Sequence, residues 1–171
     1  MNTIEHTLII FKPDALQRGL VGEIVTRFEK VGLKIVGAKL LKPSRDHLFH
    51  HYETIGQMIT RRGQRAFDDT VSMVDNGPLF AFVLEGIEAV SLVRKMVGAT
   101  EPKNALPGTI RGDYAHMSFA HADAQAIGLP NLIHASGSTD EAKAEIDHWF
   151  KKDEIFSYEA SHEFHTQTKK K

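Results

Sequence analysis

The chain has 171 residues, a formal net charge of −1, 42% hydrophobic residues and no cysteine. This length predicts a single domain over residues 1–171, with enough chain for a real hydrophobic core. The near-neutral charge gives no electrostatic basis for binding nucleic acid or an anionic membrane, and the missing cysteine excludes disulfides and thiolate chemistry. Because no apolar run reaches membrane-spanning length and no signal-peptide pattern is present, we expect a cytoplasmic protein.

Four apolar runs predict β-strands. They are Leu8 to Phe11, Leu33 to Leu41, Leu79 to Leu84, and a run that leads to His134. The first is apolar at every position, which is typical of a strand buried on both faces, and Pro13 ends it.

Apolar residues spaced three or four positions apart predict the helices. The stripes are Ile24, Phe28 and Val31; Phe67, Val71 and Val74; Ile87, Val90, Val93 and Val97; and Ala142, Ile146 and Trp149. Ser44 is expected to cap a further helix that runs to about Ile55. Glycine and proline predict loops at Gly56 to Gly63 and at Glu101 to Gly112.

This order of strands and helices suits a ferredoxin-like α+β sandwich, a four-stranded antiparallel sheet with helices packed on one face. The pattern alone leaves a flavodoxin-like parallel sheet open as well.

The last strand and the last helix bring three reactive side chains together. His134 and Ser136 are two apart, so they face the same way in an extended chain. Ser138, with Glu141 three residues later, has the capping-box pattern, and the helix that follows must fold back to bury its stripe. Glu145 then comes within reach of His134. A carboxylate that binds one imidazole nitrogen fixes the tautomer, and the other nitrogen can act as a nucleophile.

A phosphate site in this chain must be built from dispersed cations, because neither GxxxxGK[ST] nor GxGxxG is present. Lys12, Arg94 and Arg111 lie near strand ends or loops, where side chains converge. Arginine matches phosphate oxygens with two parallel hydrogen bonds, and lysine adds a point charge.

Several histidines have less specific signals. His47, His50 and His51 have the i, i+3, i+4 spacing of a helical metal site, but no carboxylate-rich or cysteine-rich segment completes one. A solvated helix face is therefore favoured, and no protein-bound metal is predicted. His116 and His121 receive no assignment.

Three stretches, in the right order, resemble the nucleoside diphosphate kinase family. Asn131 to Ser136, with sequence NLIHAS, resembles the active-site signature of asparagine, two apolar residues, histidine, glycine or alanine, and serine. Thr7 to Gly22 resembles the opening strand with its Lys-Pro-Asp motif. Arg94 to Tyr114 resembles the phosphate-binding arginines and the proline loop between them. The resemblance covers nearly all of the chain from Thr7 to Phe150.

The resemblance implies an enzyme that moves the γ-phosphate of a nucleoside triphosphate, typically ATP, to a nucleoside diphosphate. Transfer would be ping-pong, with His134 as the nucleophile that becomes phosphohistidine and with Glu145 and Ser136 orienting it. The implied substrate-binding residues are Lys12, Tyr52, Arg94, Thr100, Arg111 and Asn131. Mg²⁺ would be bound through the phosphates of the nucleotide.

The chain departs from the family pattern near the site and on the side of the base. Gly137 replaces the usual aspartate, and residues 53–76 and 115–130 are longer than usual. Phe67 is the nearest candidate for the base-stacking phenylalanine. Base preference is left open, and broad acceptance of bases is expected. These departures keep an alternative open, a nucleotide-binding regulatory protein of the same fold with weak or no turnover.

Residues 151–171 form a C-terminal extension beyond the last predicted helix. Ile155, Phe156 and Tyr158 are apolar enough to dock, whereas residues 169–171 are all lysine. Together with the proline loop, the extension implies by resemblance a homo-oligomer, a hexamer built from dimers, with a tetramer as the alternative.

Overall fold

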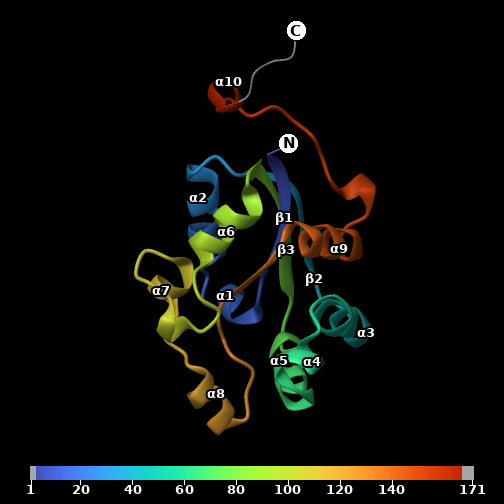
Figure 1. Cartoon of the computed structure of the whole chain (residues 1–171), viewed down its shortest axis with the longest axis vertical. Helices are drawn as coiled ribbons and strands as arrows, with labels where there is room; N and C mark the ends of the chain where they lie inside the picture. The colour runs from blue at the N-terminus through green and yellow to red at the C-terminus, as the bar shows by residue number, and fades with distance from the viewer. Residues whose placement is uncertain (1–2, 167–171) are drawn as a thin grey trace.

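The computed structural model describes residues 3–166, so the lysines at 169–171 lie outside the described part. One four-stranded sheet organises the molecule (Figure 1). Its strands are β1 (Ile4–Phe11), β2 (Lys34–Leu41), β3 (Leu79–Ile87) and β4 (Ile133–Ala135). They lie in the order β2-β3-β1-β4, and every neighbouring pair is antiparallel. The ferredoxin-like α+β class is confirmed, and the parallel alternative is excluded.

Helices and helical turns connect the strands. They are α1 (Pro13–Gln17), α2 (Val21–Lys30), α3 (Arg45–Phe49), the π-helical η1 (His50–Ile55), α4 (Met58–Arg62), α5 (Gln64–Val74), α6 (Ala89–Val97), the 3₁₀ turn η2 (Pro102–Asn104), α7 (Ile110–Tyr114), α8 (Phe119–Gln125), α9 (Thr139–Trp149), the 3₁₀ turn η3 (Lys152–Glu154) and α10 (Glu163–Thr166). None of those in the described part is long and apolar enough to cross a bilayer.

Two segments predicted as loops are partly helical. The stretch 56–63 contains α4. The carboxylate of Glu53 accepts a hydrogen bond from the backbone amide of Ile59 at 2.6 Å and so stabilises the start of this helix. The stretch 101–112 contains η2 and the start of α7, whose N-cap Thr109 accepts a hydrogen bond from the amide of Gly112. Ile87, predicted in a helix, ends strand β3 instead.

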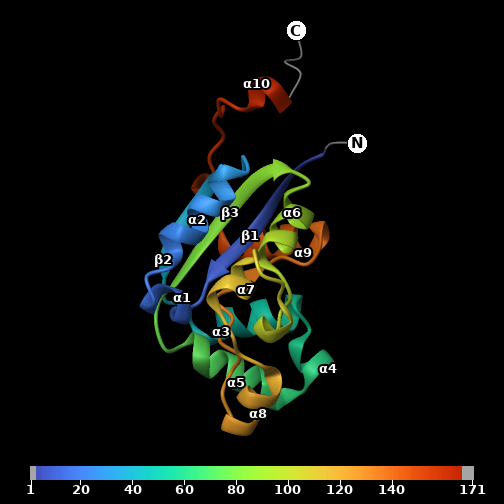
Figure 2. The same ribbon diagram turned by 90° about the vertical axis from the view of Figure 1, so that its left-hand side faces the viewer.

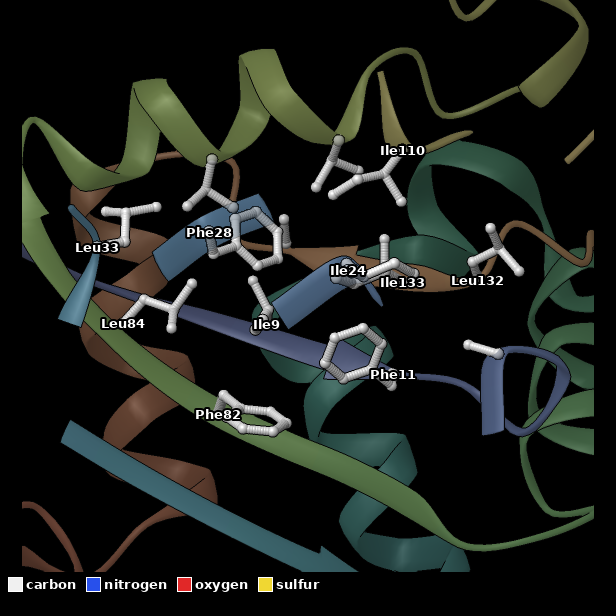
Figure 3. Close-up of a cluster of buried hydrophobic side chains, with 14 of the residues drawn as sticks. Ile9, Phe11, Ile24, Phe28, Leu33, Phe82, Leu84, Ile110, Leu132 and Ile133 are labelled. Carbon is white, nitrogen blue, oxygen red and sulfur yellow. The ribbon is translucent and has the colours of Figure 1, made fainter. Parts of the chain in front are cut away.

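Helices cover both faces of the sheet, so the expectation of helices on one face was wrong. In β1, Ile9 and Phe11 belong to a core shared with α2 and α6, which Figure 3 shows in close-up. Leu8 and Ile10 point the other way, into a core shared with α3, α5 and α9. Figure 1 shows α2 and α6 on one side of the sheet and α9 and α3 on the other. The fully apolar run in β1 follows from this double burial.

The C-terminal extension runs along the edge strand β2. The amide of Phe156 donates to the carbonyl of Val36 at 2.8 Å, although the Phe156 side chain is 65% exposed. Tyr158 is also largely exposed, and its hydroxyl donates to a β2 carbonyl at 2.9 Å. Of the three residues expected to dock through apolar side chains, only Ile155 packs against a core cluster. The extension is therefore attached mainly by polar contacts.

Lys34 of β2 anchors the far end of the extension. Its ammonium group is 2.7 Å from the carboxylate of Glu163 in α10 and 2.5 Å from that of Glu85 in β3. It also donates to the Tyr158 carbonyl at 2.7 Å. The Lys34 side chain is only 8% exposed. A cation so little exposed requires such partners, so the extension contributes to folding.

Truncation after Phe150 should therefore lower the free energy of unfolding by about 2 kcal/mol, because the Lys34, Tyr158 and Lys39–Glu154 contacts are lost. Urea denaturation measures this loss. Truncation after Thr166 is the matched control, because it keeps all of these contacts. Equal stability of the two truncated proteins would contradict the anchoring role.

Candidate active site

A strained turn sets the start of the site. Leu132 is buried and has φ +70°, a left-handed conformation that is costly for a residue with a branched side chain. Two bonds hold it: its amide donates to the carboxylate of Asp14 at 3.0 Å, and its carbonyl accepts from the amide of Lys12 at 2.9 Å. The Lys-Pro-Asp stretch thus fixes the chain two residues before His134. This role of Asp14 is not evident from the sequence.

His134, Ser136 and Glu145 meet as expected. The Nε2 of His134 lies 2.7 Å from Oε1 of Glu145, and the hydroxyl of Ser136 donates to Oε2 at 2.6 Å. The Leu8 amide of β1 donates to the Ser136 oxygen at 3.2 Å. Ser136 and Glu145 are buried, whereas the His134 side chain is 20% exposed. One buried carboxylate therefore holds the histidine and is itself held by the serine.

His51 of η1 lies behind this trio, and its predicted solvated position was wrong. Its ring is fully buried and stands edge-on to the His134 ring, with centroids 4.6 Å apart. The indole of Trp149 donates to its Nδ1 at 3.2 Å, and this nitrogen is 3.7 Å from Glu145. Burial and the neighbouring histidines lower the pKa of His51 well below its usual value, so the ring is neutral.

His51, His134 and Glu145 also bring three ligand atoms within 4.8 Å of one another, which is close enough to hold a metal ion. The spacing of the three histidines does not indicate this carboxylate, because Glu145 comes from a distant helix. Hydrogen bonds already account for the facing atoms of the three side chains.

His148 of α9 lies against the other two histidines of the trio 47, 50 and 51, stacked on His47 and tilted to His50. The ring of His148 lies 3.8 Å from that of His47 and 4.3 Å from that of His50. Burial, followed by the nearby His148, lowers the pKa of His47 to about 4. His50 is exposed, as expected, and His47 is partly buried.

Glu141 places an acidic group beside Gly137. The predicted capping box is half formed. The Ser138 hydroxyl accepts a hydrogen bond from the Glu141 amide at 3.1 Å. The Glu141 carboxylate, however, accepts its hydrogen bond from the amide of Gly137, at 3.3 Å, and not from that of Ser138. A Cβ atom on Gly137 would lie 2.7 Å from that carboxylate. The acidic group that seemed lost with the aspartate is therefore supplied from the first turn of α9.

Lys12 and Asn131 form the polar floor of the site. The Lys12 ammonium donates to the Asn131 side-chain oxygen at 2.7 Å, and the Asn131 amide donates to the carbonyl of Thr100 at 2.9 Å. Burial, and then the charge of Arg111, lower the pKa of Lys12 to about 8. This ammonium lacks a carboxylate partner within salt-bridge distance among the described residues, which suits it to receive an anion.

Two arginines converge on the same place. Arg111 is 3% exposed and donates to the carbonyls of Asn131, Gly98 and Ile133 at 2.5–3.1 Å. Burial, with the charge of Arg94 next in importance, lowers its pKa to about 9, so it stays charged at neutral pH. Arg94 makes one long bond, 3.4 Å, to the carbonyl of Ala135. Its guanidinium is freer than that of Arg111 to bind a ligand.

One cavity of about 250 Å³ collects the predicted residues. His134 and all six predicted substrate-binding residues line it: Lys12, Tyr52, Arg94, Thr100, Arg111 and Asn131. Ser136 and Glu145 do not line it and lie buried behind His134. Burial raises the pKa of Tyr52, so its hydroxyl stays protonated and can donate to an anion.

Phe67 does not face this cavity. It is 3% exposed and packs edge-on against Phe49, with ring centroids 5.6 Å apart. As a base-stacking candidate it was therefore wrong: its place in the apolar stripe of α5 directs it into the core. The two lengthened segments instead contribute Met58, Arg61, Arg62, Thr70 and Leu129 to the cavity wall.

An oriented histidine, facing cations that converge without a glycine-rich loop, defines a phosphotransferase built on a ferredoxin-like sheet. The family model described as nucleoside diphosphate kinase matches residues 5–155. The chain belongs to the nucleoside diphosphate kinase family.

Similar proteins cover almost the whole chain. A nucleoside diphosphate kinase of Borreliella burgdorferi is 42% identical, covering 94% of this chain and 95% of its own. A nucleoside diphosphate kinase of Pyrococcus furiosus is 46% identical, covering 92% of this chain and 90% of its own. A solved transition-state mimic of the Borrelia burgdorferi enzyme, with bound vanadate and ADP, has a TM-score of 0.91 and 41% identity, covering 95% of this chain and 96% of that one. The activity is accordingly phosphoryl transfer from a nucleoside triphosphate to a nucleoside diphosphate.

The Gly137–Glu141 arrangement can be tested by restoring the aspartate. Gly137→Asp should lower the free energy of unfolding by about 1 kcal/mol at neutral pH, because two carboxylates would then compete for one place. Denaturant titrations of the single and double variants measure the coupling, and Glu141→Ser in the same chain should reverse most of the loss. If the effects of the two substitutions on the free energy of unfolding were additive, the proposed contact between positions 137 and 141 would be contradicted.

Proposed function

We propose that His134 attacks the γ-phosphate through Nδ1 and becomes phosphohistidine. The carrying observation is the 2.7 Å contact between Nε2 and Glu145. In the neutral ring, Nε2 keeps its hydrogen and donates it to the carboxylate, so the lone pair is on Nδ1. His134 lines the cavity while Glu145 lies behind it, which supports Nδ1 as the nitrogen available to a substrate.

The first half-reaction forms a bond between Nδ1 and the γ-phosphorus and breaks the bond from that phosphorus to the bridging oxygen. The nucleoside diphosphate leaves with the bond electrons, and no proton has to move. The ring then becomes more positive, and Glu145 stabilises that charge through the Nε2 hydrogen bond. A second nucleoside diphosphate reverses these steps in the same site, a ping-pong scheme.

Ser136 and Glu145 would orient the nucleophile rather than touch the phosphate. Glu145 is 1% exposed, and both of its oxygens have partners. A carboxylate held this firmly limits rotation of the His134 imidazole. The entropic cost of orienting the ring in the transition state is therefore smaller.

The cations would stabilise the phosphates in different ways. Lys12, Arg94 and Thr100 line the cavity with few competing bonds, so they fit direct phosphate contacts. Arg111 already donates to three carbonyls, so it acts mainly as a fixed positive charge. In a loose phosphoryl transition state, such positioning and charge supply most of the catalysis.

Mg²⁺ fits this site as an ion carried by the nucleotide. Glu141 is the one carboxylate among the described residues around the cavity, too few ligands for a protein-built magnesium cage. Phosphate oxygens would therefore hold the ion, with Glu141 close by, and the ion would neutralise charge on the phosphates.

We further propose a cytoplasmic enzyme that assembles as a homohexamer built from three dimers. Leu106 supports a contact through the proline loop, because it is 73% exposed in the segment 101–112. The extension leaves part of the β2 edge accessible, since its described backbone contact is at Val36. The tetramer is the alternative, and the mass in solution distinguishes the two.

Replacing the nucleophile tests the proposal directly. His134→Gln should abolish formation of an acid-labile, base-stable phosphoprotein from radiolabelled ATP, while ADP binding stays within a few-fold of the parent because the cations remain. Gel analysis after acid and base treatment, with calorimetry for ADP, gives both values. Label on the variant near the parental level would refute the role of His134. A parent that binds nucleotide but takes no label would favour the regulatory alternative.

The lowered pKa of Lys12 predicts a pH dependence. With its pKa at about 8 in the free enzyme, Lys12 loses its charge as the pH rises through 8, and phosphate binding must restore the proton. ADP affinity should fall from pH 7 to 9, and binding should take up an increasing fraction of a proton. Calorimetry in buffers of different ionisation enthalpy measures the uptake.

The effect on stability has the opposite direction. The unfolded chain, with Lys12 at its usual 10.5, binds more protons between pH 8 and 10.5, so this residue's contribution to stability rises with pH there. Lys12→Met is the control and should bind ADP more weakly at every pH, without the uptake. The same uptake in this variant would assign the titration to another group.

A further inference from the structure

The two lengthened segments meet beside the cavity. The guanidinium carbon of Arg62, in α4, lies over the ring of Phe119, in α8, 4.0 Å from its centroid. Arg65, in α5, donates to the carbonyl of Asp123, in α8, at 3.0 Å. Figure 2 shows α8 beside α4 and α5 at the end of the molecule away from α10. A wall of the cavity is therefore made by segments far apart in the sequence.

Close backbone packing holds this wall together. A Cβ atom on Gly128 would lie 2.6 Å from the carbonyl of Asp69 in α5. Only glycine at position 128 therefore lets the chain after α8 lie this close to α5. The distance between the two segments is thus set by their backbones as well as by Arg62 and Phe119.

Arg62 lies between Phe119 and the cavity. Arg62 lines the cavity and Phe119 does not, while the guanidinium carbon of Arg62 lies over the Phe119 ring. A guanidinium with one face against this ring has its second face left for a ligand. Arg61, the neighbouring cation, is occupied because its guanidinium donates to the carbonyl of Gly56. No side-chain hydrogen bond of Arg62 occurs within the described part of the chain.

The surroundings of Arg62 differ from those of His134. Met58 and Leu129, from the same two segments, are apolar. The phosphate-binding candidates come instead from the start of α1, from α6 and the loop after it, and from α7. A nucleotide with its terminal phosphate at His134 would direct its other end to the wall that remains. A planar cation with apolar neighbours suits the flat face of a base.

We propose that Arg62 is the base-stacking residue of this enzyme, with Phe119 as the positioning residue that holds the guanidinium plane. This role rests on the proposed function, because it assumes that the phosphates bind at His134. It replaces the stacking once expected of Phe67, which is buried in the core. Recognition of a π-face is tolerant of base identity, so the arrangement accepts purines and pyrimidines, and purines gain more from their larger area.

Affinities of ADP, CDP and inorganic pyrophosphate, measured by calorimetry or by competition, test the assignment. Arg62→Ala should raise the Kd of ADP about 10-fold and that of CDP less, with pyrophosphate unchanged within about twofold. Arg62→Lys should behave like Arg62→Ala, because it keeps the charge and loses the plane. Phe119→Ala should weaken ADP in the same direction, and Phe119→Tyr should restore it.

Arg65→Ala is the matched control, since it removes an arginine contact between the same segments without touching the cavity, and it should leave all three affinities unchanged. Recovery of ADP affinity by Arg62→Lys, or an equal loss for pyrophosphate, would make Arg62 a phosphate ligand and overturn the stacking role. Unchanged ADP affinity in Arg62→Ala would do the same.

These affinities need no turnover, so a parent that binds ADP without accepting label would refute the proposed phosphotransfer by His134 and still report on Arg62. A parent that binds no ADP would overturn both assignments.

Discussion

The burial of one carboxylate is the constraint on which the rest of the site depends. Glu145 lies in the interior, where an ionised group without partners would be very unfavourable. Its two oxygens are satisfied by His134 in β4 and by Ser136 directly after this strand. The same contacts that make the buried charge tolerable also select the tautomer of the histidine. Folding and orientation of the proposed nucleophile are thus one requirement.

The sheet supplies the rigidity that this arrangement needs. β1 is bonded to β3 along its length and to β4 at its end, and both of its faces are packed. The strained Leu132 can persist because Lys12 and Asp14, just after β1, hold its carbonyl and amide. His134 is therefore positioned from the central strand. The π-helical turn η1 adds His51 and Tyr52 from the other side, in keeping with the frequent use of such turns near functional sites.

The sequence predicted local features better than long-range ones. The strands, the α9 cap and the His134–Glu145 contact follow from periodicity and spacing, which are local properties. The helices on the second face were missed although the unbroken apolar run of β1 indicated burial on both faces, because long-range packing decides which face each helix covers. The contacts of Glu141 and Asp14 were missed because each carboxylate binds a backbone amide. Glu141 binds the amide of Gly137 and not that of the neighbouring Ser138, which the capping box predicts. Asp14 binds the amide of Leu132, which is 118 positions away in the sequence. His51 was misplaced because its burial depends on Trp149, which the chain brings there only after folding.

The way the extension lies on β2 has a consequence for how the protein behaves at high concentration. An uncovered edge strand offers free amides and carbonyls to any other extended chain, and long apolar edges recruit such partners. Here the chain near Val36 is occupied by Phe156, while Leu40 farther along the same strand remains 59% exposed. The extension therefore shortens the edge that is open to strand pairing outside the proposed assembly. Besides its contribution to stability, this cover would limit aggregation of the folded enzyme in a crowded cell, a benefit that no assay of phosphoryl transfer would register.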